Sequence, residues 1–231
     1  MAELYHDKHV YDVTKFGAKP NADISRQAIL TAWRMASGTR TASTIIIPAA
    51  TFSLSQTTIV APQDSRNTDG TPHCTYKQHK VLDSKIGTGD DCISFGDGAQ
   101  HIHIEKVKCG PGHGISIGSL GKYPNEQPVS GITVKDCTLT GTMYGARIKT
   151  WRGSPPSTAS DIHFNGITMD NVANPIIIDQ EYCNARFKCP AKPPSKVQIN
   201  KVSFKNIKGS SSTPAAVKLV CSNDVPCVTL S

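Results

Sequence analysis

Short apolar segments recur along this chain at a regular spacing, and this repeat constrains the fold more than any other feature. Three segments follow one another at an identical spacing: HIHIEKVKC (101–109), GITVKDCTL (131–139) and DIHFNGITM (161–169). A fourth segment, KVQINKVSF (196–204), follows at a slightly longer spacing. Each segment predicts two very short strands joined by a bend, because its apolar alternation stops briefly and then resumes. Such a period is typical of stacked repeats that bury their apolar side chains against each other.

A second series of short strands lies between these segments. Its members are DCISF (91–95), HGISIG (113–118), ARIKT (146–150), PIIID (175–179) and AVKLV (216–220). The two series together give each repeat about three strands, β-branched residues dominate, and helical periodicity is absent from these segments. An antiparallel sandwich of short strands is the alternative fold. The register of the repeats favours an all-β protein, a right-handed parallel β-helix.

Residues 23–37, near the start of the chain, have a helical pattern instead. Their apolar residues that fall on one helical face are Ala28, Ile29, Ala32, Trp33 and Ala36. Asp23 or Ser25 is a candidate N-cap residue for this helix. Because a solenoid must cover its open first coil, we expect an N-terminal capping α-helix at about 23–37. No Pro/Gly/Ser-rich linker divides the chain, so residues 1–231 are expected to form a single domain.

The net charge of +7 and the pI of about 9.0 favour an acidic partner, such as nucleic acid, an anionic membrane or a polyanionic sugar. The basic residues are scattered, without a Lys/Arg block or interleaved aromatic residues, which argues against nucleic acid. No apolar run approaches the roughly 18 residues that a membrane-spanning helix needs, so no membrane partner is expected.

The chain contains 8 cysteines, and the closely spaced pairs in CNARFKC and CSNDVPC are typical of small disulfide loops that form in an oxidising compartment. Three disulfides are predicted, namely Cys92–Cys109, Cys183–Cys189 and Cys221–Cys227, while Cys74 and Cys137 are left over. The spacings fit zinc poorly, because there is no C-x-x-C pair and the histidines do not cluster. A secreted, extracellular protein is expected, although the N-terminal stretch MAELYHDKHVYDV has no apolar region of a signal peptide.

Polar residues gather on the second strand series. The sequence KIGTGDDCISFGDG puts two adjacent aspartates, Asp90 and Asp91, at the start of one strand, and His113 opens the next. Arg147 and Lys149 alternate with apolar residues on the following strand, so both are expected to point outward. Asp69 lies one coil before Asp90. Because equivalent positions of successive coils lie about 4.8 Å apart, these side chains are expected to share one face.

Each of these features alone has a structural explanation. Asp90 and Asp91 fit turn and capping chemistry, and Asn67 and Asp69 fit Asx turns. His113 between two glycines fits a surface loop, and the two cations fit a solvated strand face. Their predicted co-location on adjacent coils favours a functional site.

Four motifs, in this order, resemble the signatures of the polygalacturonase family of glycoside hydrolases: NTDG (67–70), GTGDDC (87–92, with Lys85 and Ile86 before it), CGPGHGISIGS (109–119) and RIK (147–149). The N-terminal segments VYDVTKFGA, AILTAW and IIIPAATF resemble the same family, and GHGISIGSLGKYPNE is similar to plant pollen exopolygalacturonases. The resemblance implies a right-handed parallel β-helix that hydrolyses α-1,4-linked galacturonan in plant cell-wall pectin. It implies no metal and no organic cofactor, with polygalacturonate as the partner of a monomeric enzyme.

The resemblance also implies roles for the site residues. Asp90 would be the general acid of an inverting hydrolase, and Asp69 and Asp91 would position and activate the water. Such enzymes place an acid and a base carboxyl about 6.5–9.5 Å apart, and crowding of aspartates keeps one of them protonated near neutral pH. The other implied roles are tuning of the acid by His113 and substrate binding by Asn67, Arg147, Lys149 and Tyr182.

Compared with the family pattern, QTTIV joins two distant segments directly, at about 55–62, which implies a shortened solenoid. Two hypotheses follow: an active pectin hydrolase, or a truncated, weakly active or inactive relative that only binds pectin. A divalent-metal hydrolase site is a third interpretation of the acidic cluster, and the adjacent cations argue against it.

Overall fold

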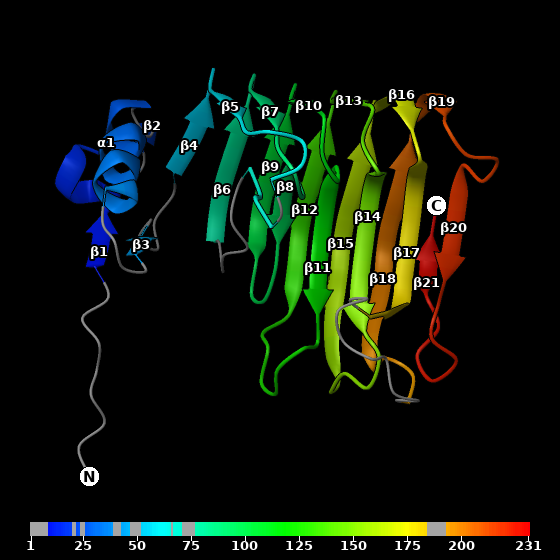
Figure 1. Cartoon of the computed structure of the whole chain (residues 1–231). Helices are drawn as coiled ribbons and strands as arrows, with labels where there is room; N and C mark the ends of the chain where they lie inside the picture. The colour runs from blue at the N-terminus through cyan, green and yellow to red at the C-terminus, as the bar shows by residue number, and fades with distance from the viewer. Residues whose placement is uncertain are drawn as a thin grey trace, which may run out of the picture.

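The computed structural model describes residues 9–19, 22–23, 26–38, 43–46, 52–65, 67–70, 77–183 and 193–231. All of its strands except β1 and β3 form three parallel sheets that run along a stack of coils, so the predicted parallel β-helix is confirmed (Figure 1). Each full coil contributes one strand to the first sheet, one to the second and one to the third, in that order along the chain.

The first sheet has eight strands, in spatial order β2 (Ala22–Asp23), β4 (Phe52–Ser55), β6 (Lys77–Leu82), β9 (Gln100–Glu105), β12 (Val129–Lys135), β15 (Ser157–Asn165), β18 (Val197–Lys205) and β21 (Val228–Leu230). The second sheet has six, β5 (Thr58–Val60), β7 (Lys85–Gly87), β10 (Lys108–Cys109), β13 (Thr138–Thr140), β16 (Thr168–Val172) and β19 (Lys208–Ser211). The third sheet has five, β8 (Ile93–Phe95), β11 (Ile115–Leu120), β14 (Tyr144–Trp151), β17 (Asn174–Tyr182) and β20 (Val217–Val220).

The core lies inside the coils and is built from columns of equivalent apolar residues. Ile102, Ile132 and Ile162 pair in register on three neighbouring strands, and all are buried. Phe164 and Phe204 stack with their ring centroids 5.3 Å apart. Because full burial of such side chains contributes about 1.5–3 kcal/mol each, repeated columns of this kind stabilise the stack.

The register of the last coil differs from the sequence prediction. The apolar pattern aligned Ile162 with Val197, whereas the structure pairs Ile162 with Val202 and Phe164 with Phe204. The third sheet shows the same longer coil, since Ile176 pairs with Val217. The extra residues lie between β17 and β18, a connection whose length the apolar pattern of the strands does not constrain. The equal spacing predicted for the earlier segments is confirmed, because Ile102, Ile132 and Ile162 are in register.

A column of left-handed residues forms the bend between the first and second sheets. Its members, one per coil, are Gln56, Asp83, Lys106, Asp136, Gly166 and Asn206, with φ between +46° and +71°. Each of the first five donates its backbone N–H to a carbonyl of the next coil, such as Gln56 to Leu82 and Lys106 to Lys135. The bend is therefore part of the ladder that holds neighbouring coils together.

The predicted join at about 55–62 is a regular coil. Leu54 pairs with Val81 and Ile59 with Ile86, so the register is the same on both sides of the bend. Thr57 donates its N–H to Ser84 Oγ, and Lys85 donates its own to the carbonyl of Thr57. Hydrogen bonding therefore continues across the join.

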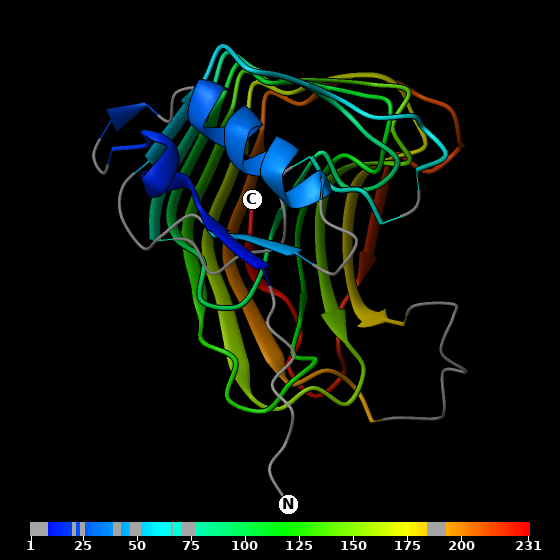
Figure 2. The same cartoon turned by 60° about the vertical axis from the view of Figure 1, so that its left-hand side comes forward.

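The predicted helix is present as α1 (Arg26–Ser37) and lies at the N-terminal end of the stack (Figures 1 and 2). Its buried Ala28 and Ala32 pack with Val13 and Ala18. This small cluster also involves β1 (His9–Asp12) and the 3-10 helix η1 (Val13–Phe16), and among the described residues it is separate from the core of the coils. Helix α1 also lies near β3 (Ser43–Ile46), which pairs with β1 in a separate two-stranded sheet.

The helix begins later than the predicted residue 23, because residues 22–23 form strand β2. The side chain of Trp33, which was predicted on the buried face, and Ser25 lie outside what the structure describes. Asp23 lies in β2 and does not begin the helix. No helix in the described part of the chain is long and apolar enough to cross a membrane.

Two of the predicted disulfides are present, Cys92–Cys109 and Cys221–Cys227. Cys183 is disulfide-bonded, but Cys189 lies outside the described residues, as does Cys74, so the Cys183–Cys189 pairing stays a prediction. Cys137 is a free, buried thiol, as expected. Burial raises the pKa of Cys137 to about 11, so this thiol stays protonated at neutral pH.

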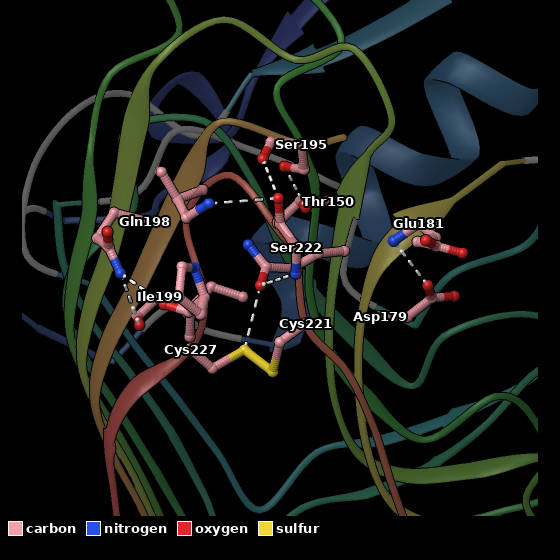
Figure 3. Close-up of a disulfide and its surroundings, with 12 residues drawn as sticks. Thr150, Asp179, Glu181, Ser195, Gln198, Ile199, Cys221, Ser222 and Cys227 are labelled. Carbon is pink, nitrogen blue, oxygen red and sulfur yellow. Dashed lines mark hydrogen bonds between the residues drawn. A yellow bond between two sulfur atoms is a disulfide. The ribbon is translucent and has the colours of Figure 1, made fainter. Parts of the chain in front are cut away.

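The Cys221–Cys227 disulfide closes a buried polar network at the C-terminal end of the stack (Figure 3). Ser222 donates its hydroxyl to the carbonyl of Ser195 at 2.7 Å, and Thr150 donates to the hydroxyl of Ser195 at 2.7 Å. The network links the last coil to the ends of β14 and β17, because Ser222 N–H also binds the side chain of Gln180. Buried polar groups with satisfied partners of this kind fix one arrangement of the chain.

Candidate active site

The third sheet positions the candidate site through strict alternation of inward and outward side chains. Ile93, Ile115 and Ala146 form one inward column, and Phe95, Ile117 and Ile148 form the next. Between these columns the register stacks Ser94, Ser116 and Arg147, which point outward. The prediction that Arg147 and Lys149 face away from the core is therefore confirmed.

Asp69 is held directly beside the aspartate pair. Asp90 donates its backbone N–H to the carbonyl of Thr68, and Gly70 donates its own to the carbonyl of Asp91. A Cβ at Gly70 would lie only 2.2 Å from Ile86 Cγ2 and 2.5 Å from the carbonyl oxygen of Cys92, so only glycine allows this approach. The Asp69 carboxylate accepts a hydrogen bond from Ser94 Oγ at 2.7 Å.

Asp90 pairs with His113 of the next coil. His113 Nδ1 lies 2.8 Å from Asp90 Oδ1, and His113 donates its backbone N–H to the carbonyl of Asp90. The hydrogen bond with His113 lowers the pKa of the Asp90 carboxyl, against the opposing effect of partial burial. Asp90 is therefore a carboxylate in the ligand-free protein at neutral pH.

Asp91 pairs with Lys149, which lies two coils further along the sheet. Lys149 Nζ lies 2.9 Å from Asp91 Oδ2, and Ser116 Oγ donates to Asp91 Oδ1 at 2.7 Å. Both charged side chains are buried, with 3% and 10% of their side-chain surfaces exposed for Asp91 and Lys149. Lys149 therefore neutralises Asp91, a role that the resemblance to the family had not assigned to it.

The local environments of Asp69 and Asp90 shift the pKa values of these two carboxyls in opposite directions. Burial raises the pKa of Asp69 to about 6, and the charges of Asp91 and Asp90 add to this effect. The pKa of Asp90 is shifted in the opposite direction by His113. The carboxyl that keeps its proton nearest to neutral pH is therefore Asp69 in the ligand-free protein. The resemblance had implied Asp90 for that state, but the sequence does not show the His113 contact.

The raised pKa of Asp69 predicts a specific dependence of stability on pH. The folded protein binds this proton more tightly than the unfolded chain, so the free energy of unfolding falls as pH rises from about 4 to about 6. Asp69→Asn removes this loss and keeps an acceptor for Ser94. We expect the variant to be similar to the wild type at pH 4 and more stable at pH 7. The gain should be about 1–2 kcal/mol, because solvent screens a carboxyl that is only partly buried.

Urea denaturation at both pH values measures this difference. Asp90→Asn is the control, and we expect the opposite effect from it. Because the pKa of Asp90 is lowered, its carboxylate contributes stability above about pH 4 that is lost as pH falls, and the variant lacks this contribution. An Asp69→Asn variant that is less stable than the wild type at pH 7 would contradict the electrostatic argument.

Arg147 is the cation of the site that has no acidic partner among the described residues. Its guanidinium lies 3.7 Å from the ring centroid of Tyr144 and 5.4 Å from that of Tyr182. Its Nε–H is buried and has no hydrogen-bond partner among the residues that the structure describes. An Arg side chain held between aromatic rings with a donor unused is suited to bind a carboxylate.

Tyr182 ends β17 beside these cations. Lys149 Nζ lies 5.5 Å from its ring centroid, and the ring of Trp151 packs against it edge-on at 5.0 Å. Burial raises the pKa of the Tyr182 hydroxyl, so this group remains a neutral donor. Asn67 is exposed and has a left-handed φ of +51°, which fits the turn-forming explanation of this residue.

Sequence reasoning missed four residues of the site, Ser94, Ser116, Tyr144 and Trp151. The two serines carried a signal, because each is the only polar residue between two apolar ones in DCISF and GISI. Tyr144 and Trp151 flank the RIK motif on the same strand, and His113 meets the ring of Tyr144 edge-on at 6.0 Å. An aromatic residue that flanks a functional strand gives no signal that separates it from a core residue.

One cluster has the composition of a metal site. Asp90, Asp91 and His113 each place a ligand-type atom within 4.8 Å of the others. These groups are already engaged, since His113 binds Asp90 and the ammonium of Lys149 contacts Asp91. A divalent cation would be repelled by Lys149, so the arrangement fits metal-independent chemistry better.

Comparison with known proteins gives relatives over most of the chain. The profile of glycosyl hydrolases family 28 matches residues 38–231. A polygalacturonase of Medicago sativa is 56% identical over 171 residues, which cover 74% of this chain and 40% of that protein. An exopolygalacturonase of Arabidopsis thaliana is 52% identical over 186 residues, or 80% of this chain and 42% of that protein. An exopolygalacturonase of Oenothera organensis is 54% identical over 169 residues, or 73% and 46%.

These figures mean that the matched regions span less than half the length of each of these relatives. Among solved structures, endo-xylogalacturonan hydrolase from Aspergillus tubingensis matches with a TM-score of 0.60 and 18% identity, covering 96% of this chain and 73% of that one. At this identity the likeness concerns the fold alone.

Proposed function

Because the chain belongs to glycosyl hydrolases family 28, we propose that it hydrolyses the α-1,4 linkages of galacturonan, the acidic chain of pectin, with inversion at the anomeric carbon. One observation carries this proposal. Three aspartates lie beside His113 and the buried cations Arg147 and Lys149 on a single face of the third sheet, and the pKa values of two of them, Asp69 and Asp90, are shifted in opposite directions. Glycoside hydrolysis by inversion needs a proton donor, a base for water and, for this substrate, a group that binds carboxylate.

The first step is binding of a galacturonate carboxylate by Arg147. Its guanidinium is fixed by Tyr144 and Tyr182, so little conformational entropy is lost when two parallel hydrogen bonds form to the carboxylate. Lys149 contributes mainly by holding Asp91, since its ammonium is already 2.9 Å from that carboxylate.

Proton donation to the leaving oxygen is assigned to Asp90 acting with His113. Asp90 Oδ1 and His113 Nδ1 lie 2.8 Å apart, so a proton taken up by Asp90 stays hydrogen-bonded within this pair. A bound galacturonate brings a negative charge close to Asp90 and disfavours its ionised form, which favours uptake of this proton by Asp90. Asp90 then delivers this proton as the glycosidic bond breaks.

Activation of the water is assigned to Asp69, with Asp91 as a fixed negative neighbour. A carboxylate with a pKa of about 6 is a stronger base than an ordinary aspartate, and it is still ionised at neutral pH. Ser94 donates to Asp69 Oδ2, so the orientation of this carboxylate is fixed.

Release of reducing sugar from polygalacturonate tests the activity. We expect release that persists in EDTA, and a kcat/KM that rises as pH increases through about 6, because Asp69 must lose its proton to act as the base. A rate that falls through about 6 would instead assign the proton donor to Asp69. Loss of activity in EDTA would replace this mechanism with a metal-dependent one.

A second candidate function is binding of pectin without efficient turnover. It is favoured by Arg147, which lies against the ring of Tyr144 with a donor that no described residue uses, and which can bind a carboxylate whether or not turnover follows. Binding of polygalacturonate that is not followed by release of reducing sugar would support it.

Exo-action at chain ends and a place in the plant cell wall are further parts of the proposal. They are supported by the names of two relatives and, for an extracellular location, by the disulfides. Analysis of product length distinguishes exo-action, which releases one sugar size, from internal cleavage.

A further inference from the structure

A second cation stands beyond the aromatic rings that border the candidate active site. Lys122 Nζ lies 5.8 Å from the ring centroid of Trp151 and 5.2 Å from that of Tyr123. Trp151 in turn packs edge-on against Tyr182, whose ring faces Arg147. Two aromatic rings, Tyr182 and Trp151, therefore separate Lys122 from Arg147.

The loop that carries Lys122 is built around a single carboxylate. Glu126 accepts backbone N–H groups from Gly121, Lys122 and Tyr123 at 2.6, 2.8 and 2.9 Å. Three such bonds to one carboxylate fix the backbone of residues 121–123. The loop also joins the preceding coil, because Gln127 donates its backbone N–H to Asp97 Oδ1.

Contact with the neighbouring loop fixes Lys122 relative to Trp151. Gly121 has a φ of +77°, and a Cβ at this position would lie 2.2 Å from the Cβ of Ser154. Because Gly121 and Ser154 approach so closely, the loops after β11 and β14 pack together at one end of the coils (Figure 1). Ser154 is itself buried and hydrogen-bonded to Ser195.

The charge of Lys122 is available for a ligand. Glu126 uses its carboxylate on backbone groups, and within the described residues no acidic side chain forms an ion pair with Lys122. Lys122 is exposed, and Tyr123 beside it is 60% exposed. A cation held between two rings by a rigid loop offers charge and a flat apolar surface together, which is what an acidic sugar can use.

We propose that Lys122, Tyr123 and Trp151 form an outer subsite that binds the carboxylate and ring of a further galacturonate of the same chain. This sugar does not directly adjoin the one held at Arg147, because the rings of Tyr182 and Trp151 lie between the two cations. This inference rests on the proposed function, because it assumes that polygalacturonate occupies the face of the third sheet. The outer subsite makes the enzyme select for de-esterified sugars at two positions of the chain.

Galacturonate oligomers of defined length test the outer subsite. Binding is measured by calorimetry in an Asp90→Asn background, so that the ligand is not consumed. We expect Lys122→Ala to raise the Kd of the tetramer about threefold to tenfold, and by a larger factor than that of the dimer, because only the longer ligand reaches both cations. Lys122→Arg should restore tetramer binding, since the charge and its position are kept.

Lys108→Ala is the matched control, since it removes the same charge from an exposed position on β10 of the second sheet. It should leave both Kd values unchanged. Equal losses for dimer and tetramer in Lys122→Ala, or equal losses in the Lys108 variant, would overturn the outer subsite. If wild-type protein hydrolyses polygalacturonate and Lys122→Ala binds the tetramer normally, this inference alone fails. Absence of any binding or hydrolysis by the wild type would contradict the proposed function itself.

Discussion

Replacing Asp90 by asparagine is expected to lower hydrolysis of polygalacturonate by about 10³-fold while substrate binding is kept, because general acid catalysis contributes roughly 10²–10⁴-fold. An amide cannot supply the proton to the leaving oxygen. The oxygen of the introduced amide still accepts a hydrogen bond from His113, so the geometry of this part of the site is retained. Initial rates and the Kd of an oligogalacturonate, measured on the same preparation, separate the two effects.

Asp136→Asn is the matched control for this variant. Asp136 is exposed and left-handed in the bend after β12, at a different corner of the coil from the third sheet, and asparagine tolerates this conformation. This control should keep the wild-type rate. Turnover of the Asp90 variant within about tenfold of the wild type would remove Asp90 from the role of proton donor.

The second large effect concerns the buried ion pair. Lys149→Met is expected to reduce the free energy of unfolding by about 3–5 kcal/mol, because it leaves the Asp91 carboxylate buried without its cation. Methionine keeps most of the side-chain length, so little of this loss comes from an empty cavity. Chemical denaturation at pH 7 measures it, and pectate hydrolysis should be lost as well, since Asp91 no longer has a fixed charge and position.

A second substitution distinguishes the charge effect from a general packing effect. In the Lys149→Met/Asp91→Asn double variant no charge is left unpaired, and Ser116 can still donate to the amide oxygen. Most of the lost stability should return, which gives a coupling energy between the two positions. A double variant as unstable as the sum of the single variants would show that the pair is not coupled.

Much of the fold was predictable because every coil of a parallel stack needs apolar residues at equivalent positions. A β-branched residue that points inward in one coil needs an apolar neighbour in the next, so Ile102, Ile132 and Ile162 recur at the observed register. The alternation of Arg147 and Lys149 with Ala146 and Ile148 likewise determines which of them face outward. Both inferences use only backbone geometry, which every coil shares.

The features that the sequence did not predict depend on loop lengths and side-chain contacts, which do not repeat from coil to coil. The connection between β17 and β18 lengthens its coil, and no apolar alternation reports the length of a loop. The partner of Lys149 is Asp91, 58 residues away, and only the side-chain directions determine that pairing. The same is true of the opposite pKa shifts of Asp69 and Asp90, which follow from the burial of Asp69 and from the hydrogen bond between Asp90 and His113.

The left-handed column between the first and second sheets has a consequence for how such proteins can change over evolutionary time. It runs through Gln56, Asp83 and Lys106 without interruption, although the coils it links differ in length and sequence. A change of length that keeps one such residue per coil preserves the hydrogen bonds of the bend. The longer coil that contains the connection between β17 and β18 is an example, because Gly166 still donates its backbone N–H to the carbonyl of Lys205. Length can therefore change by whole coils or within the connections, but not at the bend itself. A lineage can lengthen or shorten the rest of the stack in this way while the coils that carry the candidate site are inherited unchanged.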